Sequence, residues 1–114
     1  MTPATAPEQA RRTLSNEIRA AVKAATRHAV HPADEFEGDH ARIAGWDPEE
    51  TRSNAALLRL GTAHLAGLGW QIFPEATDSE DASALVIKRG LATGRLYAAN
   101  RSLTFTGTLD TPNT

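Results

Sequence analysis

Two strand-like segments joined by an acidic loop carry the residues that come nearest to a catalytic pattern. Within residues 69–90, the first segment ends at Pro74-Glu75 and the second ends at Lys88. A carboxylate and a lysine at the ends of neighbouring strands could hold a divalent metal ion and orient a water molecule. The loop adds three more acids, Asp78, Glu80 and Asp81. A divalent-metal-dependent hydrolase is therefore one functional hypothesis.

The same segment resembles the PD-(D/E)xK nuclease family, in which an acid-x-lysine triplet on the second strand completes the metal site. Here the triplet is Val86-Ile87-Lys88, so valine stands where the second metal-binding acid belongs. A valine side chain has no atom that coordinates a cation. Acidic residues are common in turns and depleted in strands. We therefore interpret the segment as an ordinary β-hairpin with a solvated acidic loop.

The histidines offer a second possible metal site. His28 and His31 lie close together, and Asp34, Glu35 and His40 follow them. Histidine and carboxylate ligands can hold zinc without cysteine. However, a histidine at the end of a helix also interacts favourably with the helix dipole, without any metal. We predict no metal site and no cofactor.

A basic stripe is expected on the first helix. Its members are spaced by seven, four and four residues, which places them on one face: Arg12, Arg19, Lys23 and Arg27. Such a stripe can contact nucleic-acid phosphates or an acidic protein surface. It can equally be a solvated face, because charged pairs at helical spacing are common on exposed helices. The formal net charge of −2 gives no general attraction to nucleic acid.

Composition excludes several chemistries. The 114 residues include no cysteine, which rules out thiol catalysis, disulfides and cysteine-ligated metals. The sequence has no Gly-x-Ser-x-Gly motif and no glycine-rich phosphate loop. No apolar run approaches the ~20 residues of a membrane span, and the N-terminus has no secretory signal pattern. We expect a cytoplasmic protein of a bacterial type that does not bind membranes.

Two long helices are predicted in the N-terminal half. Apolar residues recur every three or four positions from about residue 7 to residue 30. Asp47-Pro48-Glu49-Glu50 is a typical helix start, and Gly67 and Gly69 can end that second helix. Residues 31–47 could hold a short helix after Pro32. Trp46 and Trp70 flank the second helix; an exposed tryptophan at either position would indicate an interface.

The C-terminal half is predicted to form strands at 70–73, 84–88, 95–99 and 102–108, with a tight turn at Asn100-Arg101. In the last strand, threonines alternate with Leu103 and Phe105, so one face of the sheet is expected to be covered and the other exposed to solvent. Short connections favour antiparallel pairing. We therefore predict an α+β fold in which the helices pack on one face of an antiparallel sheet of three or four strands. The expected limits are a flexible N-terminus at 1–6, one domain at 7–109 and a flexible tail at 110–114.

A well-formed fold without a catalytic constellation favours a small non-catalytic binding or regulatory protein. Its partner would be another protein or a second copy of the chain, which could dimerise through sheet edges or through the first helix. Nucleic-acid binding through the basic stripe is the first alternative, and the metal-dependent hydrolase is the second.

Overall fold

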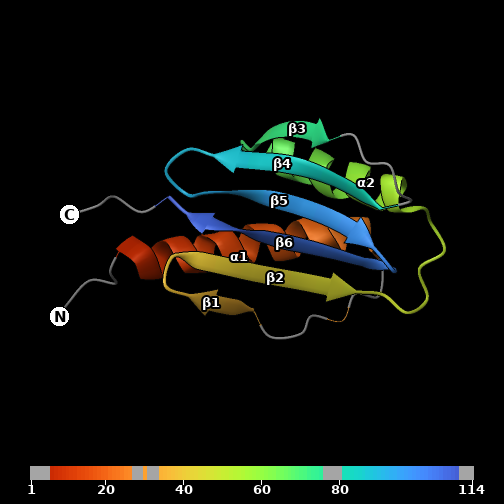
Figure 1. The fold of residues 1–114 in the computed structure, drawn as a ribbon, viewed down its shortest axis with the longest axis horizontal. Coiled ribbons are helices and arrows are strands. Elements are labelled where there is room, and N and C mark those ends of the chain that lie inside the picture. The colour runs from red at the N-terminus through yellow and green to blue at the C-terminus, as the bar shows by residue number, and fades with distance from the viewer. Residues whose placement is uncertain (1–5, 27–29, 31–33, 76–80, 111–114) are drawn as a thin grey trace.

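The described residues form a sheet of six strands, all paired antiparallel, in the order β1-β2-β6-β5-β4-β3. This computed structural model describes residues 6–26, 30, 34–75 and 81–110. The helices are α1 (Ala6–Ala25) and α2 (Asn54–Gly67). The strands are β1 (Glu35–Glu37), β2 (His40–Trp46), β3 (Gln71–Glu75), β4 (Ala82–Lys88), β5 (Ala92–Ala99) and β6 (Ser102–Leu109). Figure 1 shows both helices behind the sheet, with α1 behind β2 and β6 and α2 nearer β4 and β3.

Helix α1 buries the apolar stripe that the sequence predicts. Leu14, Ile18 and Val22 are fully buried, and Ala21 and Ala25 lie beside them. The helix ends at Ala25 rather than near residue 30. The Thr26 hydroxyl donates to the carbonyl oxygen of Val22 at 2.8 Å, which satisfies one of the last free carbonyls of the helix.

Helix α2 starts later than the sequence predicts. Its N-cap is Ser53, whose hydroxyl accepts a hydrogen bond from the Ala56 amide at 3.2 Å. Asp47 instead accepts from the Glu49 amide at 2.9 Å, which closes a turn rather than a helix. The helix ends at Gly67, and Gly69 takes a φ of 96°, so the predicted glycine stop is confirmed.

The loop before α2 is held by a buried acid. Glu50 is only 7% exposed, and both of its oxygens accept hydrogen bonds from the Arg52 guanidinium, at 2.7 and 2.8 Å. The same guanidinium also donates to the carbonyl oxygen of Ala25 at the end of α1. These hydrogen bonds lower the pKa of Glu50 from 4.5 to about 2. The pair therefore ties the loop to the helix layer and disfavours a helix start at residue 47.

The prediction of a short helix between residues 31 and 47 is wrong. That region contains β1 and β2, which form a hairpin at the edge of the sheet. Gly38 has a φ of 62°, a left-handed conformation that suits the tight turn. Burial then alternates along β2, with Ala41, Ile43 and Gly45 facing the helices. The prediction of three or four strands was therefore too low, and part of the sheet comes from the N-terminal half.

The predicted strands of the C-terminal half are confirmed, with shifted ends. Pro74 lies inside β3 rather than after it, which an edge strand tolerates because its outer side needs no donor. Strand β5 begins at Ala92. Asn100 and Arg101 both have positive φ values, 51° and 61°, and form the predicted tight turn between β5 and β6.

The core lies between the helices and one face of the sheet. Gly94 and Gly107 are paired across β5 and β6, and a Cβ on either would meet the Phe105 ring within 2.8 Å. The ring thus covers both glycines and packs edge-on against Trp70, with centroids 6.0 Å apart. None of the described helices is both long and apolar enough to cross a membrane. The predicted flexible segments lie largely outside the described residues, at 1–5 and 111–114.

Candidate functional site

Within the described residues, no helix or strand covers the face of the sheet that points away from α1 and α2. Along β2, β5 and β6 the residues between the buried ones point to this side, and the register pairs them across the strands. We call this surface the open face. Its members are His40, Arg42, Ala44 and Trp46 on β2; Ser102, Thr104, Thr106 and Thr108 on β6; Thr93, Arg95, Tyr97 and Ala99 on β5; Ser83, Leu85 and Ile87 on β4; and Gln71, Phe73 and Glu75 on β3.

Several exposed apolar side chains lie on the open face. Trp46, Phe73 and Tyr97 are 47%, 48% and 37% exposed. Val30, 55% exposed, forms a two-hydrogen-bond bridge with Trp46 and so extends the same surface. Among the described residues, the only other exposed large apolar side chains are Leu60 and Leu68, which lie on α2 and just after it. Of the two tryptophans that flank α2, Trp70 is buried and Trp46 is exposed.

Two polar contacts hold side chains of the open face in place. The Arg95 guanidinium donates to both oxygens of Glu75, at 2.6 and 3.0 Å, and the Ser83 hydroxyl donates to the same carboxylate at 3.2 Å. These bonds, mainly those from Arg95, hold the pKa of Glu75 below its ordinary value. The Tyr97 hydroxyl donates to Asp81, which raises the pKa of Tyr97. An arginine and a tyrosine are therefore fixed in orientation.

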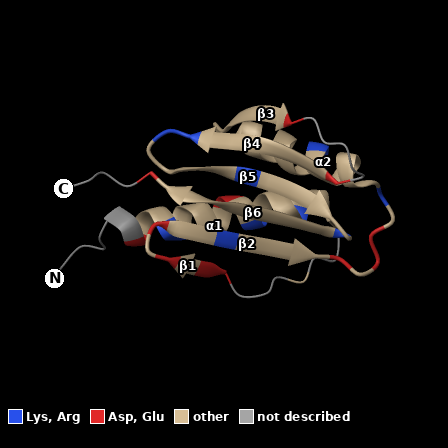
Figure 2. Cartoon of the chain, in the orientation of Figure 1, with Lys and Arg blue, Asp and Glu red and all other residues tan. Residues whose placement is uncertain are grey.

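The open face carries arginines on β2 and β5, and acids lie on both edge strands of the sheet. Arg42 and Arg95 flank Thr106 in a single row across β2, β6 and β5. Figure 2 shows the corresponding basic segments on β2 and β5 and the acidic segment of β1. Glu35 and Glu37 lie on that edge strand, and Glu75 lies on the opposite edge. The open face thus presents both signs of charge.

The acid and the lysine of the hydrolase hypothesis do not meet. Glu75 lies on the open face, whereas Lys88 faces the helix layer, where its Nζ donates to Glu17 Oε1 at 2.8 Å. The Trp70 indole donates to the same Glu17 oxygen at 3.0 Å. Val86, in the position of the missing acid, is fully buried. The predicted antiparallel pairing of β3 and β4 is confirmed, and its two sides separate these groups. The predicted acidic loop, with Asp78 and Glu80, lies outside the described residues.

The basic stripe is partly described. Arg12 and Lys23 are exposed on α1, on the side opposite Leu14 and Ile18. Arg19 forms an ion pair with Asp34 at 3.1 Å, which neutralises part of the stripe. Arg27 lies outside the described residues.

The histidine cluster is also only partly described, because His28 and His31 lie outside the described residues. Asp34 is engaged by Arg19 and by the Ser15 hydroxyl. His40 is exposed and lies 3.7 Å from Asp39. Within the described part of the chain, no three histidine or acidic side chains gather as metal ligands.

Reasoning from the sequence missed the open face as a site. The signal was present in β2, where His40, Arg42 and Trp46 alternate with smaller buried residues. It was present again in β5, where Arg95 and Tyr97 alternate with Leu96 and Ala98. Comparison with known proteins adds no assignment: no protein-family model, curated protein sequence or solved structure matches this chain.

Proposed function

We propose that this chain is a non-catalytic binding protein whose open face docks against a second copy of the chain. The observation that carries the proposal is that Trp46, Phe73, Tyr97 and Val30 all lie on one face of the sheet. Four of the six exposed large apolar side chains of the described residues therefore share this face, and exposed apolar surface concentrated on one face is typical of interaction sites.

The composition of the open face suits a protein interface. Tryptophan, tyrosine and arginine are the residues most enriched among those that dominate binding energy. Arg95 and Tyr97 are already held by Glu75 and Asp81. Docking them would cost little additional side-chain entropy, which favours affinity.

The edges of the sheet are less suited to pairing with another chain. Strand β1 has only three residues, of which Glu35 and Glu37 are exposed acids. Strand β3, at the other edge, contains Pro74. Short length, charge and proline all block strand addition. This is why we place the interface on the open face rather than on an edge.

The size and charge of the open face fit a second copy. Five strands about 4.8 Å apart and about seven residues long at 3.3 Å each give a footprint of roughly 550 Å². Side chains that project from the sheet add to this flat area and bring it closer to the roughly 800 Å² per partner of a standard specific interface. A face with one sign of charge would repel its own copy. Here arginines on β2 and β5 share the surface with acids on the edge strands β1 and β3, so opposite charges can meet.

The test is the oligomeric state, measured by sedimentation equilibrium over a wide concentration range. The unmodified chain should dimerise, and the double substitution Trp46→Ser/Phe73→Ser should weaken the dimer at least about tenfold, the equivalent of 1.4 kcal/mol. The matched control is Leu60→Ser/Leu68→Ser, which removes two exposed apolar side chains from the α2 side. The control should leave the dimer unchanged.

A monomer at millimolar concentration would refute the proposal, as would dissociation caused only by the control. The alternative function, nucleic-acid binding, is tested by titrating a short DNA duplex into the protein at low salt and following the ¹H–¹⁵N NMR spectrum. Shifts confined to Arg12, Arg19 and Lys23 of α1 would replace the proposal with nucleic-acid binding, whose affinity should then fall steeply with salt.

A further inference from the structure

His40 is a titratable side chain on the open face. It begins β2, and its side chain is 75% exposed. The register places it opposite Glu37 of β1 and Thr108 of β6, and residues paired in this way point to the same side of a sheet. Histidine is the side chain that ordinarily changes charge between pH 5 and pH 8. The open face therefore contains a group that can gain a positive charge near neutral pH.

Acids outnumber bases around His40. The hairpin of β1 and β2 places one base and three acids beside it: Arg42, Glu35, Glu37 and Asp39. Asp39 is 3.7 Å from His40, measured between Oδ1 and Nε2. Arg42 lies two residues along β2, points to the same side as His40 and pairs across the strands with Glu35. Three of these charged residues line a single hollow of about 350 Å³ together with His40, so they form one cluster.

The elements next to this hairpin leave the excess of acid unchanged. Strand β6 faces His40 with the neutral Thr108. Asp110, just beyond β6, accepts a hydrogen bond at 2.9 Å from a backbone amide of the β4–β5 turn. From α1, on the other side of the sheet, the Arg11 guanidinium reaches the β1–β2 turn but donates to the Gly38 carbonyl oxygen at 2.7 Å. A proton on His40 would therefore reduce a local negative charge.

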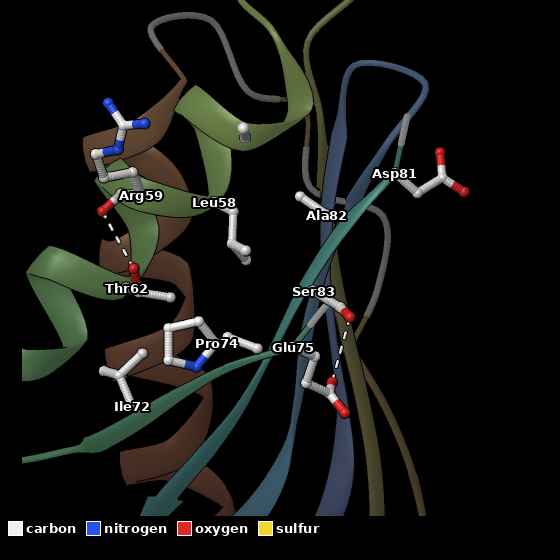
Figure 3. Close-up of a pocket in the computed structure, with 11 residues that line it drawn as sticks. Leu58, Arg59, Thr62, Ile72, Pro74, Glu75, Asp81, Ala82 and Ser83 are labelled. Carbon is white, nitrogen blue, oxygen red and sulfur yellow. Dashed lines mark hydrogen bonds between the residues drawn. The ribbon is translucent and has the colours of Figure 1, made fainter. Parts of the chain in front are cut away.

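The side of the sheet that carries the open face has the same imbalance of charge. Its strands present two arginines and three acids, and a fourth acid directly precedes β4: Arg42, Arg95, Glu35, Glu37, Glu75 and Asp81. Figure 3 shows the carboxylates of Glu75 and Asp81 turned away from Leu58 of α2, and so toward this side. Two copies docked through the open face would bring together two surfaces of negative net charge. Repulsion between like charges weakens such an interface.

We propose that protonation of His40 strengthens the dimer formed through the open face, so that the chain associates more tightly as the pH falls from 8 to 5.5. This inference rests on the proposed dimer and concerns its regulation. Each copy contributes one His40, and each proton bound there reduces the negative charge that the two faces bring together. Because linkage is reciprocal, a proton that favours the dimer is itself bound more tightly by the dimer, and lower pH shifts the equilibrium toward association.

The test is sedimentation equilibrium of the full chain at pH 8, 7, 6 and 5.5, at constant low ionic strength so that exposed charges are not screened. The dissociation constant of the dimer should fall about fivefold from pH 8 to pH 5.5, the scale of two exposed charges, one from each copy. His40→Gln stays neutral and should remove this change; because His40 is exposed, the fold should tolerate the substitution. The matched control is His64→Gln on α2, which should keep the full pH dependence.

The outcomes separate this inference from the dimer on which it rests. A dimer with the same dissociation constant at pH 8 and pH 5.5 would overturn the role of His40 and leave the proposed dimer in place. The same conclusion would follow from tighter association at pH 8, or from a pH dependence that persists in His40→Gln. A monomer at every pH would overturn the proposed dimer and this inference together.

Discussion

Acid should destabilise this fold through one buried carboxylate, Glu50. Its pKa in the folded protein is about 2, against an ordinary value of 4.5. A carboxylate with a lowered folded-state pKa contributes stability above its unfolded pKa and loses it as pH falls toward the folded one. The contribution of Glu50 is therefore complete above pH 4.5 and is lost between pH 4.5 and about 2.

The size of this contribution follows from the geometry of the pair. At about 1.4 kcal/mol per pKa unit, the full effect would be about 3 kcal/mol. The Arg52 side chain is 37% exposed, so water screens the interaction. We therefore expect about 1 to 2 kcal/mol in the free energy of unfolding. Glu50→Gln should lower the stability at pH 7 by about this amount, since it leaves Arg52 without its carboxylate.

The assay is urea denaturation at pH 7, 4.5, 3.5 and 2 for the unmodified chain and Glu50→Gln. The difference in their free energies of unfolding should shrink as the pH falls through this range. Other carboxylates titrate in both proteins and cancel in that difference. Glu49→Gln, one residue away and exposed, should behave as the unmodified chain does. A constant difference between Glu50→Gln and the unmodified chain from pH 7 to pH 2 would refute the reasoning.

Two further predictions concern the β5–β6 hairpin. Gly107→Ala should lower the free energy of unfolding by about 2 to 3 kcal/mol, because the new Cβ would lie 2.5 Å from the Thr93 carbonyl oxygen and 2.8 Å from the Phe105 ring. Denaturant titration would measure this, and an unchanged midpoint would show that the strands move apart at little cost. Arg101→Val should be less stable than Arg101→Gly by about 1 kcal/mol, because a β-branched side chain resists positive φ. Both variants lose the hydrogen bond from Arg101 to the Pro48 carbonyl, so thermal melts that coincide would contradict the role of φ.

Local sequence patterns predicted those helices and strands in which large apolar residues recur with a clear period. The stripe of Leu14, Ile18 and Val22 gave α1, and the threonine alternation of β6 gave a sheet with one wet side. Strand β2 was missed because two of its three inward residues, Ala41 and Gly45, are too small to give a clear period of two. The start of α2 was misplaced because Asp47 and Ser53 both carry capping signals, and local sequence does not rank them.

The candidate site could not be predicted because it depends on register. Glu75 and Arg95 are twenty residues apart, and they meet only because β3 and β5 flank β4. The same register puts Lys88 on the other side of the sheet from Glu75. Spacing along the chain suggested that Glu75 and Lys88 would meet, but the fold separates them. It gave no indication that Glu75 and Arg95 would form an ion pair. Only pairing between strands distinguishes the two.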